Sequence, residues 1–262
     1  MSILPVLVKA YEAQNLEVMT GYNPNQMHNW PRVPYTVFLE DNLLRGCPGL
    51  ALQEVMFLEG LGKYLTPKNS FIIGNAFGWS TVATALTFPG SRTIGIDNSA
   101  KPKGRDLTNQ IFEELSLDGG AKLGESPKGT AKICADNFDG EIDFVLIDAK
   151  HTNRAIVEDF QGVYPVCSKA CVFLFHDVLN WKMTSGFEAL TKESGLTGRF
   201  LPRTTSGMAI AYNDEMVSDD FHDYIDVFSG NLDLFSSYRQ HAFKKMNSIR
   251  QAQGKSPQRL LK

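Results

Sequence analysis

Acidic side chains and a histidine stand at the ends of two apolar segments that are predicted to be strands. Asp148 lies near the end of IDFVLIDA (142–149), and His176 and Asp177 end ACVFLFHD (170–177). Carboxylates held close together repel one another unless a cation or a proton joins them. We therefore predict that Asp148, His176 and Asp177 bind a divalent metal ion, either Mg²⁺ or, with a histidine ligand, Mn²⁺, Fe²⁺ or Zn²⁺. The alternative is that His176 packs in the core and Asp177 caps the next helix.

A glycine-rich loop follows an earlier predicted strand. The segment FIIGNAFGWST (71–81) passes through Gly74 and Gly78 into a helix, without a Gly-Lys-Ser/Thr phosphate loop or a complete GxGxxG pattern. Glycines let a backbone approach a ligand closely, and a helix amino terminus offers free N–H groups. Asp97 ends the next strand, RTIGID (92–97), where a carboxylate can accept hydrogen bonds from both hydroxyls of a ribose. Together these residues predict a nucleoside ligand.

The segments that carry these residues alternate between two periodicities. Short apolar runs predict strands, and amphipathic stretches between them predict helices. The predicted strands are residues 71–74, 92–97, 121–126, 142–149, 170–177, 198–203 and 207–213. The predicted helices are residues 79–88, 105–117, 127–138, 154–165 and 182–194. This alternation predicts a doubly wound, mostly parallel seven-stranded α/β sheet, and the short last connection predicts a terminal antiparallel β-hairpin.

The composition argues against several classes of partner. The formal net charge is -3 and the pI is about 6.0, so we expect no basic surface that attracts nucleic acid. No apolar run approaches the ~20 residues of a membrane span. The amino terminus also lacks the features of a signal peptide. We therefore predict a cytoplasmic protein without a membrane partner, whose four cysteines are reduced.

Five segments resemble motifs of one enzyme family and occur in the family's order. FIIGNAFGWST resembles the glycine-rich first motif of class I S-adenosylmethionine-dependent methyltransferases, and KLGES resembles their adenine-side motif. IDFVLIDAKH and CVFLFHDV resemble the fourth and fifth strands of a bacterial small-molecule O-methyltransferase branch with Asp-x-x-His and His-Asp motifs. RTTSGMAIAY resembles the terminal hairpin of that branch. The resemblance covers about residues 70–213 and implies S-adenosylmethionine as the cofactor.

The resemblance also implies which residues contact S-adenosylmethionine. The methionine end would meet the glycine-rich loop, the ribose would meet the second strand, and the adenine would meet the third. The implied cofactor-binding residues are Gly74, Asn75, Phe77, Gly78, Ser80, Thr81, Asp97, Asn98, Glu125, Ser126 and Asp148. Metal-dependent relatives carry acidic metal ligands at the positions of Asp148 and Asp177.

The general base is expected just beyond the fourth strand. Catechol-type relatives have a lysine there, and this chain has His151, with Lys150 as the second choice. An imidazole suits the task because it can take up a proton near neutral pH. Alternatively, His151 bonds the cofactor loop or caps the following helix. The chain departs from the family pattern at Ile72, where an acid is usual, and at Lys150, where catechol-type relatives carry a second aspartate.

We predict three parts in the chain. Residues 1–65 form a helical N-terminal extension or lid, residues 66–214 form the S-adenosylmethionine-binding Rossmann-like domain, and residues 215–262 form a helical C-terminal extension. The long loop at residues 21–35 is a lid, a partner surface or an ordered arm. Aromatic residues of the C-terminal extension do not fit one helical face, which predicts a homo-oligomer, in the simplest case a homodimer.

The leading functional hypothesis is methyl transfer from S-adenosylmethionine to a hydroxyl of a small molecule, assisted by a divalent cation such as Mg²⁺. The alternatives are a metal-dependent hydroxylase or a nicotinamide oxidoreductase on the same fold, and a cofactor-binding protein without catalysis. The sequence contains no Asn/Asp-Pro-Pro-Tyr/Phe motif, which argues against methylation of amino groups in nucleic acids.

Overall fold

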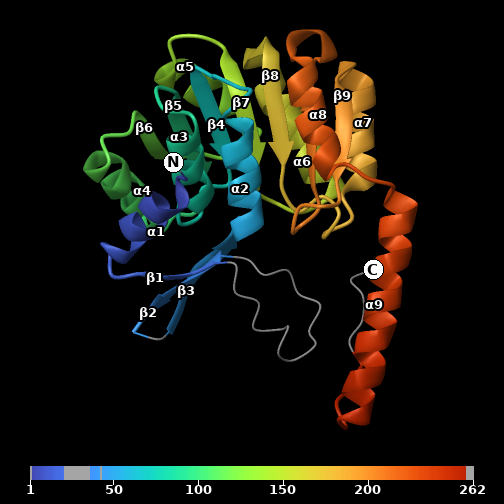
Figure 1. Cartoon of the computed structure of the whole chain (residues 1–262). Coiled ribbons are helices and arrows are strands. Elements are labelled where there is room, and N and C mark those ends of the chain that lie inside the picture. The colour runs from blue at the N-terminus through green and yellow to red at the C-terminus, as the bar shows by residue number, and fades with distance from the viewer. Residues whose placement is uncertain (1, 21–35, 42, 258–262) are drawn as a thin grey trace.

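The computed structural model describes residues 2–20, 36–41 and 43–257, without the side chains of residues 44–48. A seven-stranded sheet lies between layers of helices, a three-stranded sheet lies beside it, and a long helix projects from the body (Figure 1). The loop at residues 21–35, predicted to be a lid, a partner surface or an arm, lies outside the described residues.

The central sheet has the order β6-β5-β4-β7-β8-β10-β9. Its strands are β4 (Asn69–Ile73), β5 (Arg92–Asp97), β6 (Gly119–Leu123), β7 (Ile142–Ile147), β8 (Cys167–Phe175), β9 (Thr197–Leu201) and β10 (Met208–Tyr212). The first five run parallel, whereas β10 pairs antiparallel with both β8 and β9. The predicted doubly wound sheet with a terminal hairpin is thus confirmed. The strand order reverses between β4 and β7, and open α/β sheets bind ligands at such a point.

Helices cover both faces of this sheet. One face carries α2 (Leu52–Leu61), α3 (Trp79–Thr87), α4 (Lys103–Glu114) and α8 (Asp219–Phe228), and the other carries α5 (Thr130–Asn137), α6 (Asn153–Val163) and α7 (Thr184–Ser194). Successive side chains of a strand point to opposite faces. Ile72 of β4 therefore packs in the first core, while Phe71 and Ile73 pack in the second.

The N-terminal extension differs from the helical expectation. It contains α1 (Leu4–Glu12) and α2, but also an antiparallel sheet of β1 (Glu17–Met19), β2 (Thr36–Glu40) and β3 (Leu43–Gly49). The helical expectation holds at α1 and α2, whereas the segments between them form the three strands. Strand β2 instead alternates, with Thr36 and Phe38 buried, as a half-buried strand does.

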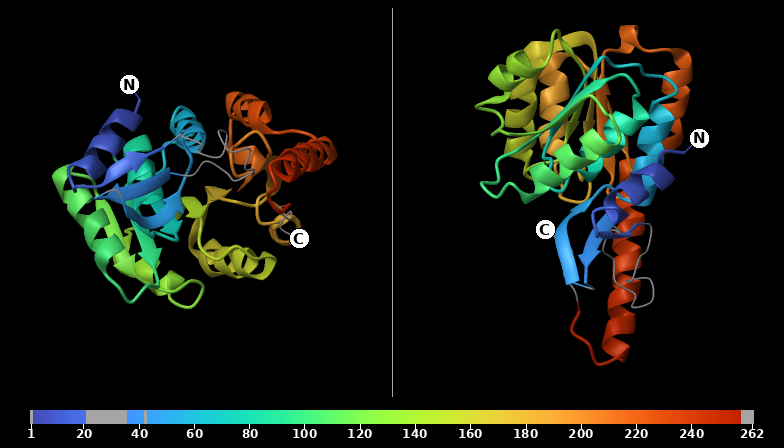
Figure 2. Two further views of the ribbon diagram at one scale, coloured as in Figure 1. Left: turned by 90° about the horizontal axis from the view of Figure 1, so that it is seen from below. Right: turned by 90° about the vertical axis from the view of Figure 1, so that its left-hand side faces the viewer.

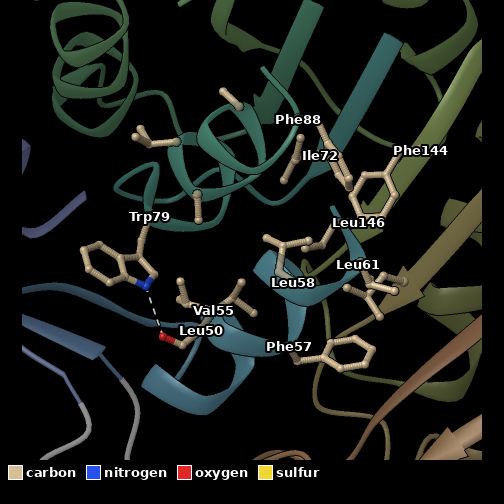
Figure 3. Packing of buried hydrophobic residues seen from close by; sticks show 14 of the residues in the cluster. Leu50, Val55, Phe57, Leu58, Leu61, Ile72, Trp79, Phe88, Phe144 and Leu146 are labelled. Atoms are coloured by element: carbon tan, nitrogen blue, oxygen red, sulfur yellow. Dashed lines mark hydrogen bonds between the residues drawn. The ribbon is translucent and has the colours of Figure 1, made fainter. Parts of the chain in front are cut away.

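Helix α2 ties this extension to the glycine-rich loop. Val55 and Leu58 pack toward the central sheet, beside the start of α3 (Figure 3). The indole nitrogen of Trp79 donates a hydrogen bond of 3.1 Å to the carbonyl of Leu50. In addition, the hydroxyl of Tyr11 donates to the carbonyl of Phe77 at 3.0 Å. The extension therefore positions the loop from outside the central sheet.

The C-terminal extension contains two α-helices, which differ in packing. Phe221 of α8 is buried against Tyr212, and Phe228 packs edge-on against Phe57. The aromatic residues of the extension were predicted to form an exposed surface, but Phe221 is part of the core and Phe228 packs against it, because α8 lies along the sheet. Helix α9 (Leu232–Ala252) extends away from the sheet (Figure 2).

Two further observations concern the expected compartment. Among the described helices, none is both long enough and apolar enough to cross a membrane. The thiols of Cys134, Cys167 and Cys171 are free, while the side chain of Cys47 lies outside the described part.

Candidate functional site

The loop between β4 and α3 is shaped by a glycine. Gly74 has a φ of +103°, and a Cβ atom there would collide with the carbonyl oxygen of Asp148 at the end of β7. The N–H groups of Gly74 and Asn75 both donate to the carbonyl of Ile96, at 3.0 and 2.8 Å. The loop is thus pressed against β7 and bonded to β5, so the sheet fixes its position.

Asn75 is held by two hydroxyl groups. Its Oδ1 accepts a hydrogen bond from Thr81 (2.8 Å), and its Nδ2 donates to Thr108 (3.0 Å). Asn75 lines the cavity described below, whereas Thr81 is fully buried behind it and Gly78 caps α3 with a φ of +85°. Gly78 and Thr81, both predicted to contact the cofactor, thus support the loop without lining the cavity.

Asp97 joins two loops at the tip of β5. Its Oδ2 accepts the N–H of Ala76 at 2.8 Å, and its Oδ1 accepts the N–H of Ser99 at 2.7 Å. Each carboxylate oxygen has a second lone pair that can accept a hydrogen bond. The carboxylate can therefore bond a diol while it keeps the glycine-rich loop in place.

A cavity of about 770 Å³ opens at the carboxyl ends of the parallel strands. The predicted residues that line it are Gly74, Asn75, Phe77, Ser80, Asp97, Asn98, Glu125, Ser126, Asp148, Lys150 and His151. The sequence analysis missed the other lining residues, which include Phe38, Arg154, Glu158 and Asp159. The cavity is large enough for a nucleoside ligand together with a small second substrate.

Asp159 of α6 is the most informative of the missed residues. Its side chain is buried, and this burial raises the pKa of its carboxyl group. It lies close to Ser126, whose buried Oγ forms no hydrogen bond of standard geometry. Both residues line the cavity, and Ser126 belongs to the segment where the adenine is expected. An acid on the otherwise apolar face of an amphipathic helix is the signal that could have identified Asp159.

The three predicted metal ligands come together beside the cavity, which Asp148 lines, and His151 joins them. Atoms of Asp148, His151, His176 and Asp177 that can bind a metal all lie within 4.8 Å of one another. The Nδ1 atom of His176 is 3.0 Å from Asp148 and 3.5 Å from Asp177. The Nε2 atom of His151 is 3.3 Å from Asp148 and 3.4 Å from Asp177.

A fifth residue, Glu54 of α2, reaches this cluster from the N-terminal extension. Its carboxylate is fully buried and lies 2.9 Å from Nε2 of His176. No local sequence pattern marks Glu54 as a site residue, because it occupies an early position of a largely apolar helix and meets His176 through tertiary packing.

The buried charges of the cluster stabilise one another. Burial alone would lower the pKa of His176, but Asp148, Glu54 and Asp177 outweigh burial and hold that pKa well above its usual value. Burial alone would raise the pKa of Asp148, but His176 and His151 outweigh it and lower the pKa to about 2. The pKa of Glu54 is lowered by His176 against the opposing effect of burial. These shifts favour the charged forms of Asp148 and Glu54, which suits a cation site.

His151 also stacks on an exposed aromatic side chain. Its ring is nearly parallel to that of Trp181, with centroids 5.5 Å apart, and Trp181 remains 45% exposed. The neighbouring Lys150 is exposed and lines the same cavity. His151 is therefore the better-fixed of the two predicted bases.

The part of the chain that carries this site matches a known family. A family model described as a methyltransferase domain matches residues 71–178, from β4 to just beyond β8. This match and the strand order agree with the predicted class I S-adenosylmethionine-dependent methyltransferase.

Solved methyltransferase structures share the fold at low sequence identity. An O-methyltransferase from Bacillus cereus in complex with SAH is 17% identical, with a TM-score of 0.50 over 63% of this chain and 83% of that chain. A methyltransferase from Geobacter sulfurreducens is 14% identical (TM-score 0.53, 79% and 94% covered). The O-methyltransferase TomG from Streptomyces achromogenes, involved in tomaymycin synthesis and solved with SAM, is 13% identical (TM-score 0.53, 81% and 90% covered). No curated protein sequence matches the chain.

Proposed function

We propose that this methyltransferase methylates a hydroxyl group of a small molecule, with the help of a divalent cation. One observation carries the proposal: a single cavity is lined both by the loop of Gly74 and Asp97 and by Asp148 and His151. A bound nucleoside cofactor and a cation would therefore lie side by side. Methyl transfer to an oxygen needs this arrangement, because the acceptor must be held in line with the methyl group and must lose its proton.

Residues of the chain would bind S-adenosylmethionine and would accept the proton of the acceptor hydroxyl. Asp97 would bond the ribose, Asn75 would face the methionine end, and Ser126 with Asp159 would meet the adenine. His151 would take the acceptor's proton, with Lys150 as the second choice. When bound, S-adenosylmethionine supplies the methyl group, and the cation makes an acceptor hydroxyl easier to deprotonate.

The donor set fits a hard or borderline divalent cation. Asp148 and Asp177 offer carboxylate oxygens, which Mg²⁺ prefers, and His176 offers a nitrogen that Mn²⁺, Fe²⁺ or Zn²⁺ also accepts. His151 lies near enough to be a ligand instead of the base. The metal ion and the two roles of His151 are parts of the proposal.

A nicotinamide oxidoreductase, a metal-dependent hydroxylase and a non-catalytic binding protein remain alternatives from other classes. The position that usually carries an acid in the family holds Ile72, which is fully buried in the core on the first face. The glycine-rich loop is held without that acid, since Asn75, Thr81 and Asp97 bond it. These hydrogen bonds favour a catalytic methyltransferase over a non-catalytic binding protein.

Ligand binding and turnover test the proposal together. S-adenosylmethionine should raise the melting temperature of the protein, because a ligand that binds the folded state alone stabilises it, and NAD should not. Methyl transfer from labelled S-adenosylmethionine to hydroxyl-bearing metabolites should then stop with a chelator and return with Mg²⁺ or Mn²⁺. Stabilisation by NAD but not by S-adenosylmethionine would refute the methyltransferase. Full activity after metal removal would refute the metal assistance.

We also propose that the protein acts in the cytoplasm as a homodimer. The free, buried thiols of Cys134 and Cys171 suit a reducing compartment. On α9, Leu234 and Tyr238 are 71% and 74% exposed and lie one helical turn apart. A second copy of the chain would cover such an apolar stripe.

A further inference from the structure

Glu54 is a fully buried carboxylate that the N-terminal extension contributes from outside the methyltransferase domain. Carboxylates are almost never fully buried without a partner. Glu54 has three: the ring of His176 and the backbone N–H groups of Ala51 and Ser206. Two of these partners, His176 and Ser206, lie far from Glu54 in the sequence. Capping of α2 requires only the third, the N–H of Ala51.

We propose that Glu54 is a positioning residue that orients His176, so that the Nδ1 atom of this histidine faces the cation site. The proposal rests on the cation site proposed above. A histidine that ligates a metal usually donates its other ring N–H to a carboxylate, which fixes the ring's orientation and tautomer. Here Nε2 of His176 lies 2.9 Å from Glu54, while Nδ1 lies 3.0 Å from Asp148.

The same carboxylate also holds the loop behind Asp177. Its Oε1 accepts the N–H of Ser206 at 2.7 Å, and the hydroxyl of Ser206 accepts the N–H of Asp177 at 3.3 Å. Asp177 has a φ of +60°, a conformation that few non-glycine residues adopt without support. Through these contacts Glu54 supports two of the cluster's residues at once.

Capping of α2 is the competing explanation. The N–H of Ala51 donates to Oε2 of Glu54 at 2.9 Å, which is one half of a capping box. If capping were the whole role, a change at Glu54 would lower stability but would leave the affinity of the folded protein for a cation unchanged. Metal affinity therefore separates the two explanations.

The test compares Mn²⁺ binding in two variants of the same helix. Glu54→Gln keeps the size and can still accept a hydrogen bond, but it loses the charge and one acceptor oxygen. Glu59→Gln is the matched control, because the carboxylate of Glu59 bonds the exposed Ser2 far from the cluster. We expect Mn²⁺ affinity, measured by electron paramagnetic resonance without substrate, to fall roughly 10–100-fold in Glu54→Gln and to stay unchanged in Glu59→Gln.

A spectroscopic measurement follows the ring itself. The chain has five histidines, so selective ¹⁵N labelling gives few signals, and His176→Asn identifies the signal of His176. In the Mg²⁺-loaded wild-type protein we expect the proton of His176 on Nε2, and we expect a mixture of tautomers in Glu54→Gln. If Glu54→Gln does not fold, Glu54→Asp replaces it, since the shorter acid keeps the charge and should still weaken Mn²⁺ binding.

The outcomes separate this inference from the proposed function. Wild-type Mn²⁺ affinity in a folded Glu54 variant would overturn the role of Glu54 and leave the proposed function intact. A wild-type protein that binds no divalent cation would overturn both the metal assistance and this inference. Weaker Mn²⁺ binding with unchanged S-adenosylmethionine affinity would support the inference.

Discussion

The position of His151 is compatible with two roles, that of a metal ligand and that of the general base. Its Nε2 atom is within 3.4 Å of carboxylate oxygens from both Asp148 and Asp177, so a cation bound there could recruit the ring as a ligand. Its ring also stacks on Trp181, a side chain that is 45% exposed. Loss of a metal ligand lowers the affinity for the cation, because the ligand holds the cation. Loss of a general base lowers turnover alone.

The variant His151→Gln distinguishes these roles. Glutamine keeps the hydrogen bonding but cannot take up a proton at neutral pH, so turnover should fall roughly 10²–10⁴-fold. Affinities for S-adenosylmethionine and Mn²⁺ should stay near wild type, and His222→Gln, a change remote from the cavity, is the control. Unchanged turnover would show that His151 is not the base, and lost Mn²⁺ binding would make it a ligand.

The charge of His176 makes the stability of the metal-free protein depend on pH. Its folded pKa is raised by Asp148, Glu54 and Asp177, so its stabilising contribution is complete below the unfolded value of about 6.5 and is lost as the pH rises toward the folded value. Between pH 6.5 and 8 the free energy of unfolding should therefore fall by up to about 1.4 kcal/mol per pH unit. Urea denaturation with a chelator measures this slope, and a His176→Asn variant with the same slope would contradict the prediction.

At the scale of elements, the loop between β4 and α3 depends on how closely it passes β7. Gly74 and Gly90 both have positive φ values, +103° and +93°, but they differ in surroundings. A Cβ atom at Gly74 would meet the backbone of Asp148, whereas nothing lies within 4 Å of one at Gly90. Alanine substitutions at these two glycines therefore distinguish the cost of backbone strain from the cost of steric collision.

Gly74→Ala should destabilise the protein more than Gly90→Ala. The strain of positive φ costs about 1–2 kcal/mol in either case. The collision at Gly74 adds a further cost of about 1–3 kcal/mol, typical of overpacking. Chemical denaturation of both variants measures the difference, and equal losses would show that the loop can move away from β7. Gly74→Ala should also weaken S-adenosylmethionine binding, while Gly90→Ala should not.

At the scale of the molecule, helix α9 leaves the body of the protein. Arg239 donates a hydrogen bond of 3.0 Å to the carbonyl of Leu179, which lies in the loop after β8, while Leu234 and Tyr238 remain exposed. With Phe221 and Phe228 in the core, α9 carries the apolar surface of the C-terminal extension that a second copy could cover.

We therefore expect a dimer in solution that depends on α9. Light scattering at micromolar concentration should give twice the 29.1 kDa mass of the chain. The double variant Leu234→Glu with Tyr238→Glu should be monomeric, because it places charges in the interface. The control Ser236→Glu with Gln240→Glu adds the same charge to the other side of α9 and should stay dimeric. A monomeric wild-type protein would rule out the dimer.

The sequence by itself determined the order of strands and helices in the central sheet and most of the predicted residues that share its cavity. Gly74, Asp97, Asp148 and His176 could be placed together because the carboxyl ends of parallel strands meet at one edge of a sheet. A local pattern that predicts each strand therefore also predicts which residues share the crevice.

Tertiary structure alone decided the rest. Glu54 meets His176 across 122 positions of sequence, and the three-stranded sheet near the amino terminus forms from short segments with weak local patterns. Phe221 could not be assigned to the core from its spacing, because burial depends on where α8 docks. Such contacts follow from the packing of whole surfaces, which gives no periodic signal along the chain.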